Sequence, residues 1–353
     1  MPQQQKAVVL EAKFGPVVLK EIDVPKAGAG QVVLRVEATA LNPGDWKVVD
    51  QGIIVQKYPL VLGFDAAGVI VEVGEGVEGF SLGDRVITQG WLESMDGQVH
   101  GTFQQYALAP TTCIAKIPSN ISFEEAATIP SGLATAALPL YNQTDGVASA
   151  KLLPAWEESG RGKYAGKAIF ILGGASSIGQ YVIQLARMSG FTFIITTASL
   201  HNTDLLKGLG ATHVLDRKLL SETLVQQVNE IAGGPASVVY DAISTTDTLS
   251  TAYQATAPGG DLVVVLHTPV PGAEENVKKI HIAFGVFHIP TNFALAKSLL
   301  SKLPELLESG EIKPNRAEIL PGGLRAVTAG LDRLRNNQVS AAKLVVRPFE
   351  TDA

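Results

Sequence analysis

Cysteine is nearly absent from this sequence of 353 residues, which holds a single one, Cys113. One thiol cannot build an internal disulfide framework or a cysteine-based zinc cluster. An excess of positive charge is also missing, since the formal net charge is −6. The sequence therefore does not predict the basic surface of a protein that binds nucleic acid. The low cysteine content fits a reducing, cytoplasmic compartment.

Long hydrophobic runs are missing as well. No uncharged apolar run reaches the roughly 18 residues of a membrane span, and residues 1–15 show no apolar signal core. Hydrophobic residues make up 46% of the chain and charged residues 18%, which is the balance of a folded globular protein. We expect a soluble protein of about two domains that does not associate with a membrane.

Short strand patterns, separated by glycine, proline and aspartate, fill the first 115 residues. Residues 122–141 predict one helix, because Ser122 can cap it and Glu125 follows three positions later. Residues 143–166 are polar and punctuated by glycine, which predicts a surface loop between domains. The tail, residues 325–349, predicts a helix and a last strand that returns to the N-terminal region.

Strands and helices alternate from Lys167 onward. Apolar strands that alternate with helices predict a parallel sheet covered on both faces. We expect strands at 167–172, 191–199, 212–216, 236–243 and 261–267, and helices at 177–189, 203–210, 221–233 and 248–257.

The segment ILGGASSIGQ, residues 171–180, joins the first of these strands to its helix. Gly173, Gly174 and Gly179 permit a tight turn and let backbone N–H groups approach a pyrophosphate. The positive N-terminus of the helix, near Ser177, would face the same anion. We predict a dinucleotide site here. The alternative is an ordinary strand–helix connection, because the spacing is not a clean G-x-G-x-x-G.

The end of the second strand indicates which dinucleotide binds. Residues 196–199 read Thr-Thr-Ala-Ser, and His201 and Asn202 follow, so no carboxylate is present to repel a 2′-phosphate. Arg217 and Lys343 add positive charge in this interpretation. We therefore favour NADPH over NADH. The alternative is that His201 and Asn202 only cap the next helix, for which Asn202 is a fair candidate, and both roles can hold together.

The chain resembles the medium-chain dehydrogenase/reductase superfamily over essentially its whole length. The resemblance rests on residues 34–47, 58–86, 101–110, 132–141 and 173–187. It is strongest to the zinc-free quinone reductase and enoyl reductase branches, and among these to fungal trans-acting enoyl reductases that partner polyketide synthases. The resemblance implies an α/β fold: a GroES-like, β-rich catalytic domain at 1–140 and 300–353, and a Rossmann domain with a doubly wound parallel sheet, binding NADP, at 141–299.

The zinc ligands of the family's alcohol dehydrogenases are replaced here. Asn42 stands where those enzymes carry a cysteine, and Gly63, Phe64 and Asp65 stand for their Gly-His-Glu. An amide and a phenyl ring cannot provide two of the three ligands that a catalytic zinc requires. We predict no metal and a structural, hydrogen-bonding role for Asp65. Four histidines stand singly: His100, His267, His281 and His288.

The resemblance also implies the site residues. It puts Pro43, Asp45, Trp46 and Lys47 near the nicotinamide ribose, with Thr135 beside the nicotinamide. Gly174, Ala175, Ser176, Ser177 and Ile178 would hold the pyrophosphate. Ser199, His201, Asn202 and Arg217 would surround the phosphorylated ribose, and Leu266 and His267, at the end of the fifth strand, would line the nicotinamide amide. Ala341, Ala342 and Lys343 would return to the same cleft.

Without zinc to polarise an oxygen, hydride transfer from NADPH to the β-carbon of an activated alkene is the favoured reaction. Lys47 and Thr135 are the catalytic candidates. Lys47 would donate to the ribose or assist a carbonyl, and its alternative role is that of a surface lysine anchored by Asp45. The alternative for Thr135 is a hydroxyl at a helix N-terminus. Tyr58, Tyr141 or solvent would supply the proton.

Three matters stay open at the level of sequence. Residues 270–292, with Phe284, Phe287 and His288, form a substrate pocket, core or an interface. The chain is a monomer or a homodimer. The activity is reduction of an enone, enal or enoyl thioester; the alternatives are an NADPH quinone reductase and a non-catalytic NADPH-binding accessory protein.

Overall fold

The computed structural model of the chain describes residues 1–53, 55, 57–90 and 101–352. Contacts divide the chain into two compact units. Unit 1 comprises Met1–Ser131, Leu300–Gly310 and Pro314–Ala353, and unit 2 comprises Gly132–Leu299 and Glu311–Lys313. The division falls within a helix near residue 131, whereas the sequence-based domains were divided at residue 140.

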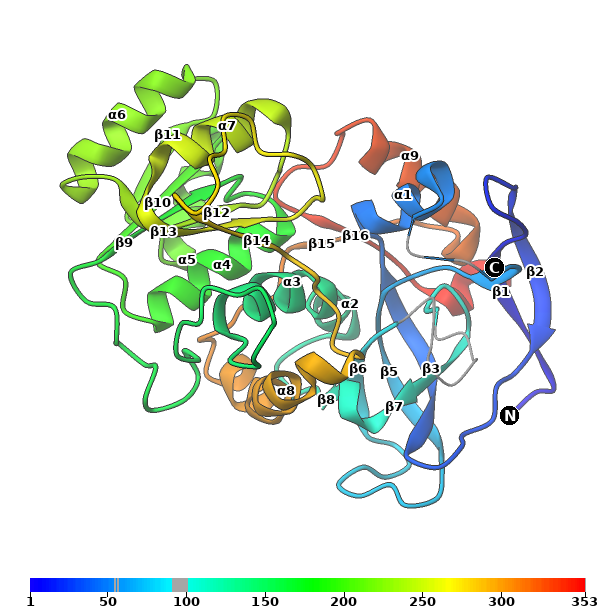
Figure 1. Cartoon of the computed structure of the whole chain (residues 1–353). Helices are drawn as coiled ribbons and strands as arrows, with labels where there is room; N and C mark the ends of the chain where they lie inside the picture. The colour runs from blue at the N-terminus through cyan, green and yellow to red at the C-terminus, as the bar shows by residue number, and fades with distance from the viewer. Residues whose placement is uncertain (54, 56, 91–100, 353) are drawn as a thin grey trace. The chain divides into compact units, whose positions relative to one another are not determined.

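Unit 1 is built on two sheets, which are antiparallel except for the parallel pair β15 and β16 (Figure 1). The strand order is β2-β1-β4 in the smaller sheet and β15-β16-β3-β5-β6-β8 in the larger, where β7 also pairs with β3. The final strand β16 pairs antiparallel with β3, which confirms that the tail returns to the N-terminal region. The strands are β1 Gln4–Leu10, β2 Val17–Asp23, β3 Gln31–Ala40, β4 Leu60–Val61, β5 Asp65–Val73, β6 Arg85–Gln89, β7 Tyr106–Pro110, β8 Ile114–Lys116, β15 Ala317–Ile319 and β16 Lys343–Val346.

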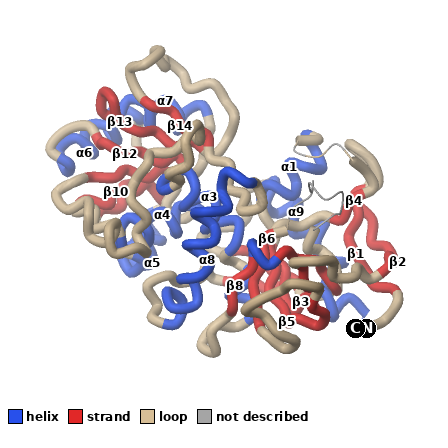
Figure 2. Tube along the Cα trace, turned by 60° about the horizontal axis from the view of Figure 1, so that its bottom comes forward, coloured by secondary structure: helices blue, strands red, loops and turns tan. Residues whose placement is uncertain are grey.

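Helices α1, Pro43–Gln51, and α9, Val327–Arg335, lie side by side in unit 1 (Figures 1 and 2). They contribute Val48 and Leu331 to a core that also contains Leu41, Phe103 and Leu344. Asparagine at position 42, proline at 43 and aspartate at 45 are the signals of a helix start, and Asn42 and Asp45 form a capping box. Lys47 therefore lies on a helix.

Unit 2 contains a six-stranded parallel sheet in the order β11-β10-β9-β12-β13-β14. This is the doubly wound order, with its switch point between β9 and β12. The predicted Rossmann topology is confirmed. The strands are β9 Ala168–Leu172, β10 Phe193–Ala198, β11 His213–Asp216, β12 Ala236–Asp241, β13 Thr256–Val264 and β14 Lys279–Ile282.

Helices cover both faces of this sheet, as the apolar strands require. Helices α6 and α7 lie over one face and α4 and α5 over the other (Figures 1 and 2). The buried residues Phe170, Ile195, Val239 and Leu262, from four strands, form the core beneath α6 and α7. These helices are α4 Ser177–Met188, α5 Thr203–Leu209, α6 Ser221–Ala232 and α7 Thr246–Ala255; α8 spans Phe293–Glu308.

The sequence-based prediction of one helix over 122–141 is wrong. Two helices occur, α2 Phe123–Ala127 and α3 Pro130–Tyr141. Pro130 explains the break, because proline disfavours helical geometry at the preceding residue. The predicted cap is confirmed, since the Ser122 side chain accepts a hydrogen bond from the backbone of Glu125.

Two further predictions need correction. Residues 143–166 contain no helix or strand, but they are not purely a surface loop, because Leu152 and Trp156 are buried in unit 2. The fifth strand, β13, begins at Thr256 and ends at Val264, so Leu266 and His267 follow it rather than end it. The short edge strand β14 did not stand out in the sequence.

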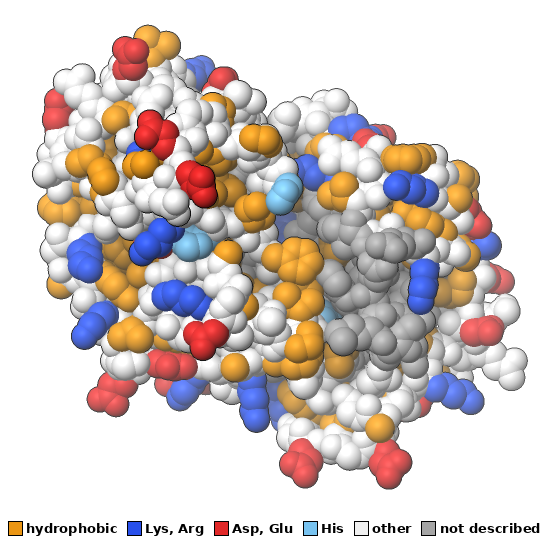
Figure 3. Space-filling model, viewed as in Figure 1, with side chains coloured by type: hydrophobic (Ala, Val, Ile, Leu, Met, Phe, Trp, Pro, Cys, Tyr) orange, Lys and Arg blue, Asp and Glu red, His pale blue; other side chains and the backbone are white. Residues whose placement is uncertain are grey.

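Among the residues that the structure describes, no helix combines the length and apolarity needed to cross a membrane. Acidic and basic side chains are interspersed over the described part of the face seen in Figure 3.

Candidate functional site

The glycine-rich turn lies at the switch point of unit 2, between β9 and α4. Gly173 has a φ of +78°, which favours glycine. Its N–H donates to Thr197 Oγ1 at 3.1 Å, and the N–H of Gly174 donates to the carbonyl of Thr197 at 3.0 Å. Ser176 caps α4 by accepting from the N–H of Gly179 at 3.0 Å. The turn is thus fixed by β10 and by the helix that follows it.

The glycines of this turn are also required by the protein's own packing. A Cβ on Gly174 would overlap Thr196 Oγ1, and a Cβ on Gly179 would overlap the carbonyl oxygen of Gly173. The resulting close approach places the N-terminus of α4 at the carboxyl edge of the sheet. This arrangement fits a phosphate.

Polar side chains gather at the carboxyl ends of β10 and β11. Arg217 Nε donates to Ser199 Oγ at 2.9 Å, so the structure brings these two predicted residues together. His201 is exposed and lies in a short 3₁₀ turn, Leu200–Asn202. Asn202 is buried and precedes α5, but its side chain does not cap that helix. These hydroxyl, imidazole and guanidinium groups are donors suited to a phosphate.

The loop after β12 belongs to the same edge of the sheet and was missed from the sequence. Asp241 Oδ1 accepts from the backbone N–H groups of Ile243 and Ser244 at 3.0 and 2.9 Å. Ser244 Oγ in turn accepts from Val265 N, which ties this loop to the end of β13. Ile243 lies against Gly173, where a Cβ would meet it at 2.5 Å. The signal that could have revealed this loop was the segment DAIS, residues 241–244, at the end of a buried strand. Polar residues at the carboxyl end of a strand next to the switch point often contribute to a ligand site.

Thr135 lies in the second turn of α3, in unit 2, and is half-buried. It is therefore not a hydroxyl at the helix N-terminus. Its carbonyl oxygen accepts a hydrogen bond from the Tyr240 hydroxyl at 2.6 Å. Gly132, one turn earlier, lies close to Ser177 of α4: a Cβ there would be 2.6 Å from Ser177 Oγ. The structure thus brings the helix of Thr135 against the start of α4.

A buried polar cluster forms in unit 1 around Asp65, which is fully buried. Asp65 Oδ2 accepts from Asn42 Nδ2 at 2.9 Å and pairs with the Lys343 ammonium. Asp65 Oδ1 accepts from the backbone N–H and the hydroxyl of Ser131 at 2.7 and 2.6 Å. The structural role predicted for Asp65 is confirmed. The expectation that Lys343 offers free charge to a phosphate is wrong, because its ammonium is buried against Asp65.

Lys47 does not have the alternative role of a surface lysine anchored by Asp45. Asp45 is fully buried, and its Oδ2 accepts from the N–H of Asn42 at 2.7 Å. Burial raises the pKa of Asp45 well above its ordinary value, and the neighbouring Asp65 adds to the rise. Lys47 is half-buried, its Nζ lies 5.7 Å from the centre of the Trp46 ring, and burial lowers its pKa. A partly desolvated ammonium is a stronger donor than one in water.

The remaining predicted residues lie in several separate segments. Pro43, at the start of α1, is exposed, and Ala341 and Ala342 directly precede β16. His267 is exposed and Leu266 half-buried in the segment after β13. Tyr58 is half-buried in unit 1. Tyr141 is unsuited as a proton donor, because it is fully buried, shares a hydrogen bond with Ser189 at 2.8 Å, and has a raised pKa caused by that burial.

Residues suited to metal binding do not converge in the part of the chain that the structure describes, where no group of three His, Cys, Asp or Glu could hold an ion. His281 pairs instead with Asp261 at 2.8 Å. His288 is half-buried in the segment after β14. His100 lies outside the described residues.

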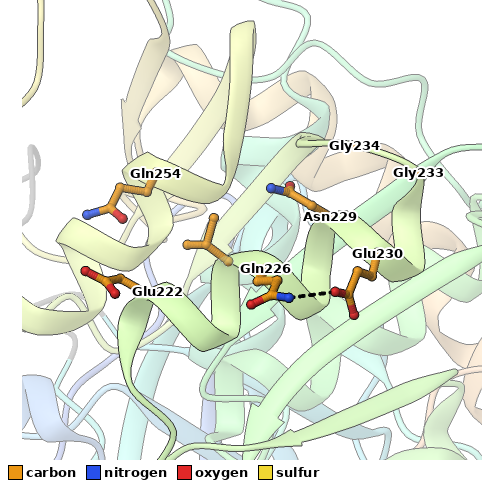
Figure 4. Close-up of a pocket in the computed structure, with 8 residues that line it drawn as sticks. Glu222, Gln226, Asn229, Glu230, Gly233, Gly234 and Gln254 are labelled. Carbon is orange, nitrogen blue, oxygen red and sulfur yellow. Dashed lines mark hydrogen bonds between the residues drawn. The ribbon is translucent and has the colours of Figure 1, made fainter.

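Two pockets lie in unit 2. One is lined by polar residues of α6, α7 and the loop after α6, among them Glu222 and Gln254, and contains no predicted site residue (Figure 4). Within it, Gln226 Nε2 donates to Glu230 at 2.8 Å. The other is apolar and lined by Leu138, Pro139 and Phe284 among others. Phe284 thus faces a pocket, whereas Phe287 is in the core.

Comparison with known proteins identifies the family. Residues 28–119 match the alcohol dehydrogenase GroES-like domain and residues 177–288 the zinc-binding dehydrogenase family. The trans-enoyl reductase himH of Aspergillus japonicus is 34% identical over 90% of this chain and 89% of its own. The trans-enoyl reductase opdC of Penicillium oxalicum is 30% identical over 98% of this chain and 97% of its own.

Solved structures agree in fold. A protein of Rhizobium etli, described as a zinc-dependent alcohol dehydrogenase, has a TM-score of 0.80 at 23% identity, and the match covers 98% of each chain. The JamJ enoyl reductase has a TM-score of 0.75 at 20% identity, covering 97% of this chain and 99% of its own. The chain belongs to the medium-chain dehydrogenase/reductase superfamily, and it is an oxidoreductase of the enoyl reductase type.

Proposed function

We propose that this protein is an NADPH-dependent reductase that transfers a hydride to an activated C=C bond without zinc. The observation that carries the proposal is the Asp65 cluster. The position that would contribute a metal-ligating cysteine holds Asn42, whose amide donates to Asp65, and the charge of Asp65 is balanced by Lys343. The donor set is satisfied within the protein, so it does not fit a catalytic zinc. The relatives named trans-enoyl reductase support the C=C bond as the acceptor.

The residues of unit 2 fit the phosphates of a dinucleotide. We assign the pyrophosphate to the turn from Gly174 to Ile178, where the N-terminus of α4 is electropositive. A neighbour of 18% identity and TM-score 0.73, the crotonyl-CoA carboxylase/reductase AntE, was solved with NADP. We assign the 2′-phosphate to Ser199, His201, Asn202 and Arg217. Arg217 is exposed and already hydrogen-bonded to Ser199, which orients its guanidinium.

The reactive end of the cofactor is assigned to Lys47 and Thr135. NADPH would supply the hydride, and the protein would supply position and charge. Lys47 would donate from α1 to the ribose or to the substrate carbonyl, where negative charge develops when the β-carbon accepts the hydride. The lining of the nicotinamide site remains assigned to Leu266, His267, Ala341 and Ala342. With Tyr141 buried, solvent is the proposed source of the proton.

The proposed substrates are enones, enals and enoyl thioesters. The relatives himH and opdC are named trans-enoyl reductases, which supports a substrate carried by a separate polyketide synthase. Such a partner would deliver an enoyl thioester on its carrier domain. Quinones are the competing acceptors, and they would be reduced at oxygen rather than at carbon.

The test is oxidation of NADPH without added metal, followed by absorbance, against enals, enones, enoyl thioesters and quinones. We expect turnover with an alkene and a saturated product. Turnover with quinones alone would replace the proposal with quinone reduction, and NADPH binding without turnover on any acceptor, carrier-bound ones included, would favour an accessory protein.

Variants at position 217 test the cofactor assignment in the same assay. Arg217→Ala should raise KM for NADPH about tenfold, the loss of one charge-assisted contact, and leave KM for NADH unchanged. Lys218→Ala is the matched control, because Lys218 is an exposed cation one residue away. Equal effects of the two substitutions would contradict the assignment.

A further inference from the structure

Helix α3 contains a proline at position 139, inside the helix. Proline has no backbone N–H, and its ring crowds the carbonyl four residues earlier. That carbonyl belongs to Thr135. The usual i to i+4 hydrogen bond is therefore missing at the residue that is proposed to contact the nicotinamide.

Tyr240 supplies a donor at this place. Its hydroxyl donates to the carbonyl oxygen of Thr135 at 2.6 Å, from strand β12 at the switch point of the sheet. Tyr240 is fully buried, and this burial raises the pKa of its hydroxyl well above the ordinary value. The hydroxyl thus keeps its proton, and remains a donor, at neutral pH.

Two glycines hold the same part of α3 from other directions. A Cβ on Gly285 would overlap Thr135 Oγ1 and lie 2.6 Å from Thr135 Cα, so the backbone after β14 lies directly against Thr135. At Gly132 a Cβ would lie 2.6 Å from Ser177 Oγ and 2.9 Å from the Tyr181 ring, so the helix also lies close to α4. The position of Thr135 is thus determined by contacts within unit 2.

We propose that Tyr240 is a positioning residue, which holds Thr135 in place for hydride transfer by replacing the hydrogen bond that Pro139 removes. The inference rests on the proposed function, because that function gives Thr135 its role. It adds a residue of β12, which acts through its hydrogen bond to the backbone of Thr135.

The test is a set of variants built on Tyr240→Phe, which removes only the hydroxyl. We expect kcat to fall about tenfold through misplacement of Thr135, with little change in the Kd for NADPH. Pro139→Ala restores an N–H that can bond the Thr135 carbonyl. In the Pro139→Ala background, Tyr240→Phe should therefore have little effect on kcat. An equal loss in both backgrounds would overturn the proposal.

A second background separates positioning from simple stabilisation. If Tyr240 acts through Thr135, Tyr240→Phe should cause no further loss of kcat in Thr135→Ala, although it still lowers the Tm. Additive losses of kcat, or a Tyr240→Phe variant that loses stability but keeps full kcat, would overturn the proposal.

Amide hydrogen exchange provides a readout that needs no turnover. Tyr240→Phe should speed exchange in α3, and Pro139→Ala should suppress that change. A wild-type protein without turnover but with this exchange pattern would refute the proposed function and leave the coupling of Tyr240 to Pro139 established. Unchanged exchange in Tyr240→Phe would refute the coupling itself.

Discussion

At the scale of single residues, Asp65 connects three parts of unit 1. Its carboxylate receives hydrogen bonds from Asn42 before α1 and from Ser131 at the start of α3, and pairs with Lys343 of β16. Each partner satisfies a group that would otherwise be buried and unpaired. The Asp65–Lys343 pair therefore affects stability mainly through the buried charge that is left unpaired when one partner is removed.

Replacing one member of this pair should destabilise the protein strongly. Asp65→Asn leaves the Lys343 ammonium buried without its counter-charge, which costs about 3–5 kcal/mol. The double variant Asp65→Asn, Lys343→Met removes both charges and should be clearly more stable than Asp65→Asn alone. Urea unfolding of the three proteins measures this, and a double variant no more stable than the single one would contradict the ion-pair account.

The raised pKa of Asp45 leads to a second prediction, on how the stability of the protein depends on pH. Its folded-state pKa is raised by burial, so the folded protein binds a proton more tightly than the unfolded chain does. Stability should then be lost as pH rises from about 4, the ordinary pKa of aspartate, to the raised folded value. Asp45→Asn removes this loss while keeping an oxygen that can accept from Asn42. The difference in unfolding free energy between variant and wild type should grow with pH over that window. A difference that is constant with pH would contradict the assignment.

Sequence reasoning at this scale succeeded where an elementary rule applied. It identified Asp65 as structural because Asn42 and Phe64 cannot ligate zinc. It failed for Lys343, because a lysine in a sequence does not reveal a buried carboxylate 278 positions away. It also missed Tyr240, since the missing hydrogen bond at Pro139 acquires meaning only when β12 lies beside α3.

At the scale of elements, the turn between β9 and α4 requires glycine at two positions for two different reasons. A Cβ on Gly174 would meet a side chain, Thr196, whereas a Cβ on Gly179 would meet the backbone of Gly173. A side chain can be shortened by substitution, but a backbone carbonyl cannot. The two positions should therefore respond differently to the same change.

We predict that Gly174→Ala and Gly179→Ala each lower the Tm and weaken NADPH binding. The costs should be on the order of 1–3 kcal/mol, as for other overpacked sites. Thr196→Ala should recover part of the loss for Gly174→Ala but none for Gly179→Ala. Thermal unfolding and NADPH titration of the four variants provide the measurement, and equal rescue of both would show that the clashes are not local.

The regular alternation of strands and helices made most elements of unit 2 predictable. The errors fall where local signals compete. Pro130 divides what appeared as one helix, and Pro43, after Asn42, starts α1 in a region where strand patterns were predicted. The loop after β12 was overlooked because its importance comes from the neighbouring Gly173, which is distant in sequence.

At the scale of the whole molecule, the two units contribute different parts of the proposed activity. Unit 2 has the doubly wound sheet, the anion-binding turn and the donors around Arg217. Unit 1 has Lys47 on α1 and the Asp65 cluster in place of a metal site. Family membership is established by the matches along both units. The acceptor is identified by the reaction that the protein catalyses.

The most direct test of the account is the fate of a labelled hydride. NADPH carrying deuterium at the transferable position would be incubated with the protein and an accepted enal, enone or enoyl thioester, and the product analysed by mass spectrometry and NMR. The account predicts a saturated product with one deuterium on the β-carbon. Consumption of NADPH with the C=C bond intact, or with deuterium absent from that carbon, would contradict it.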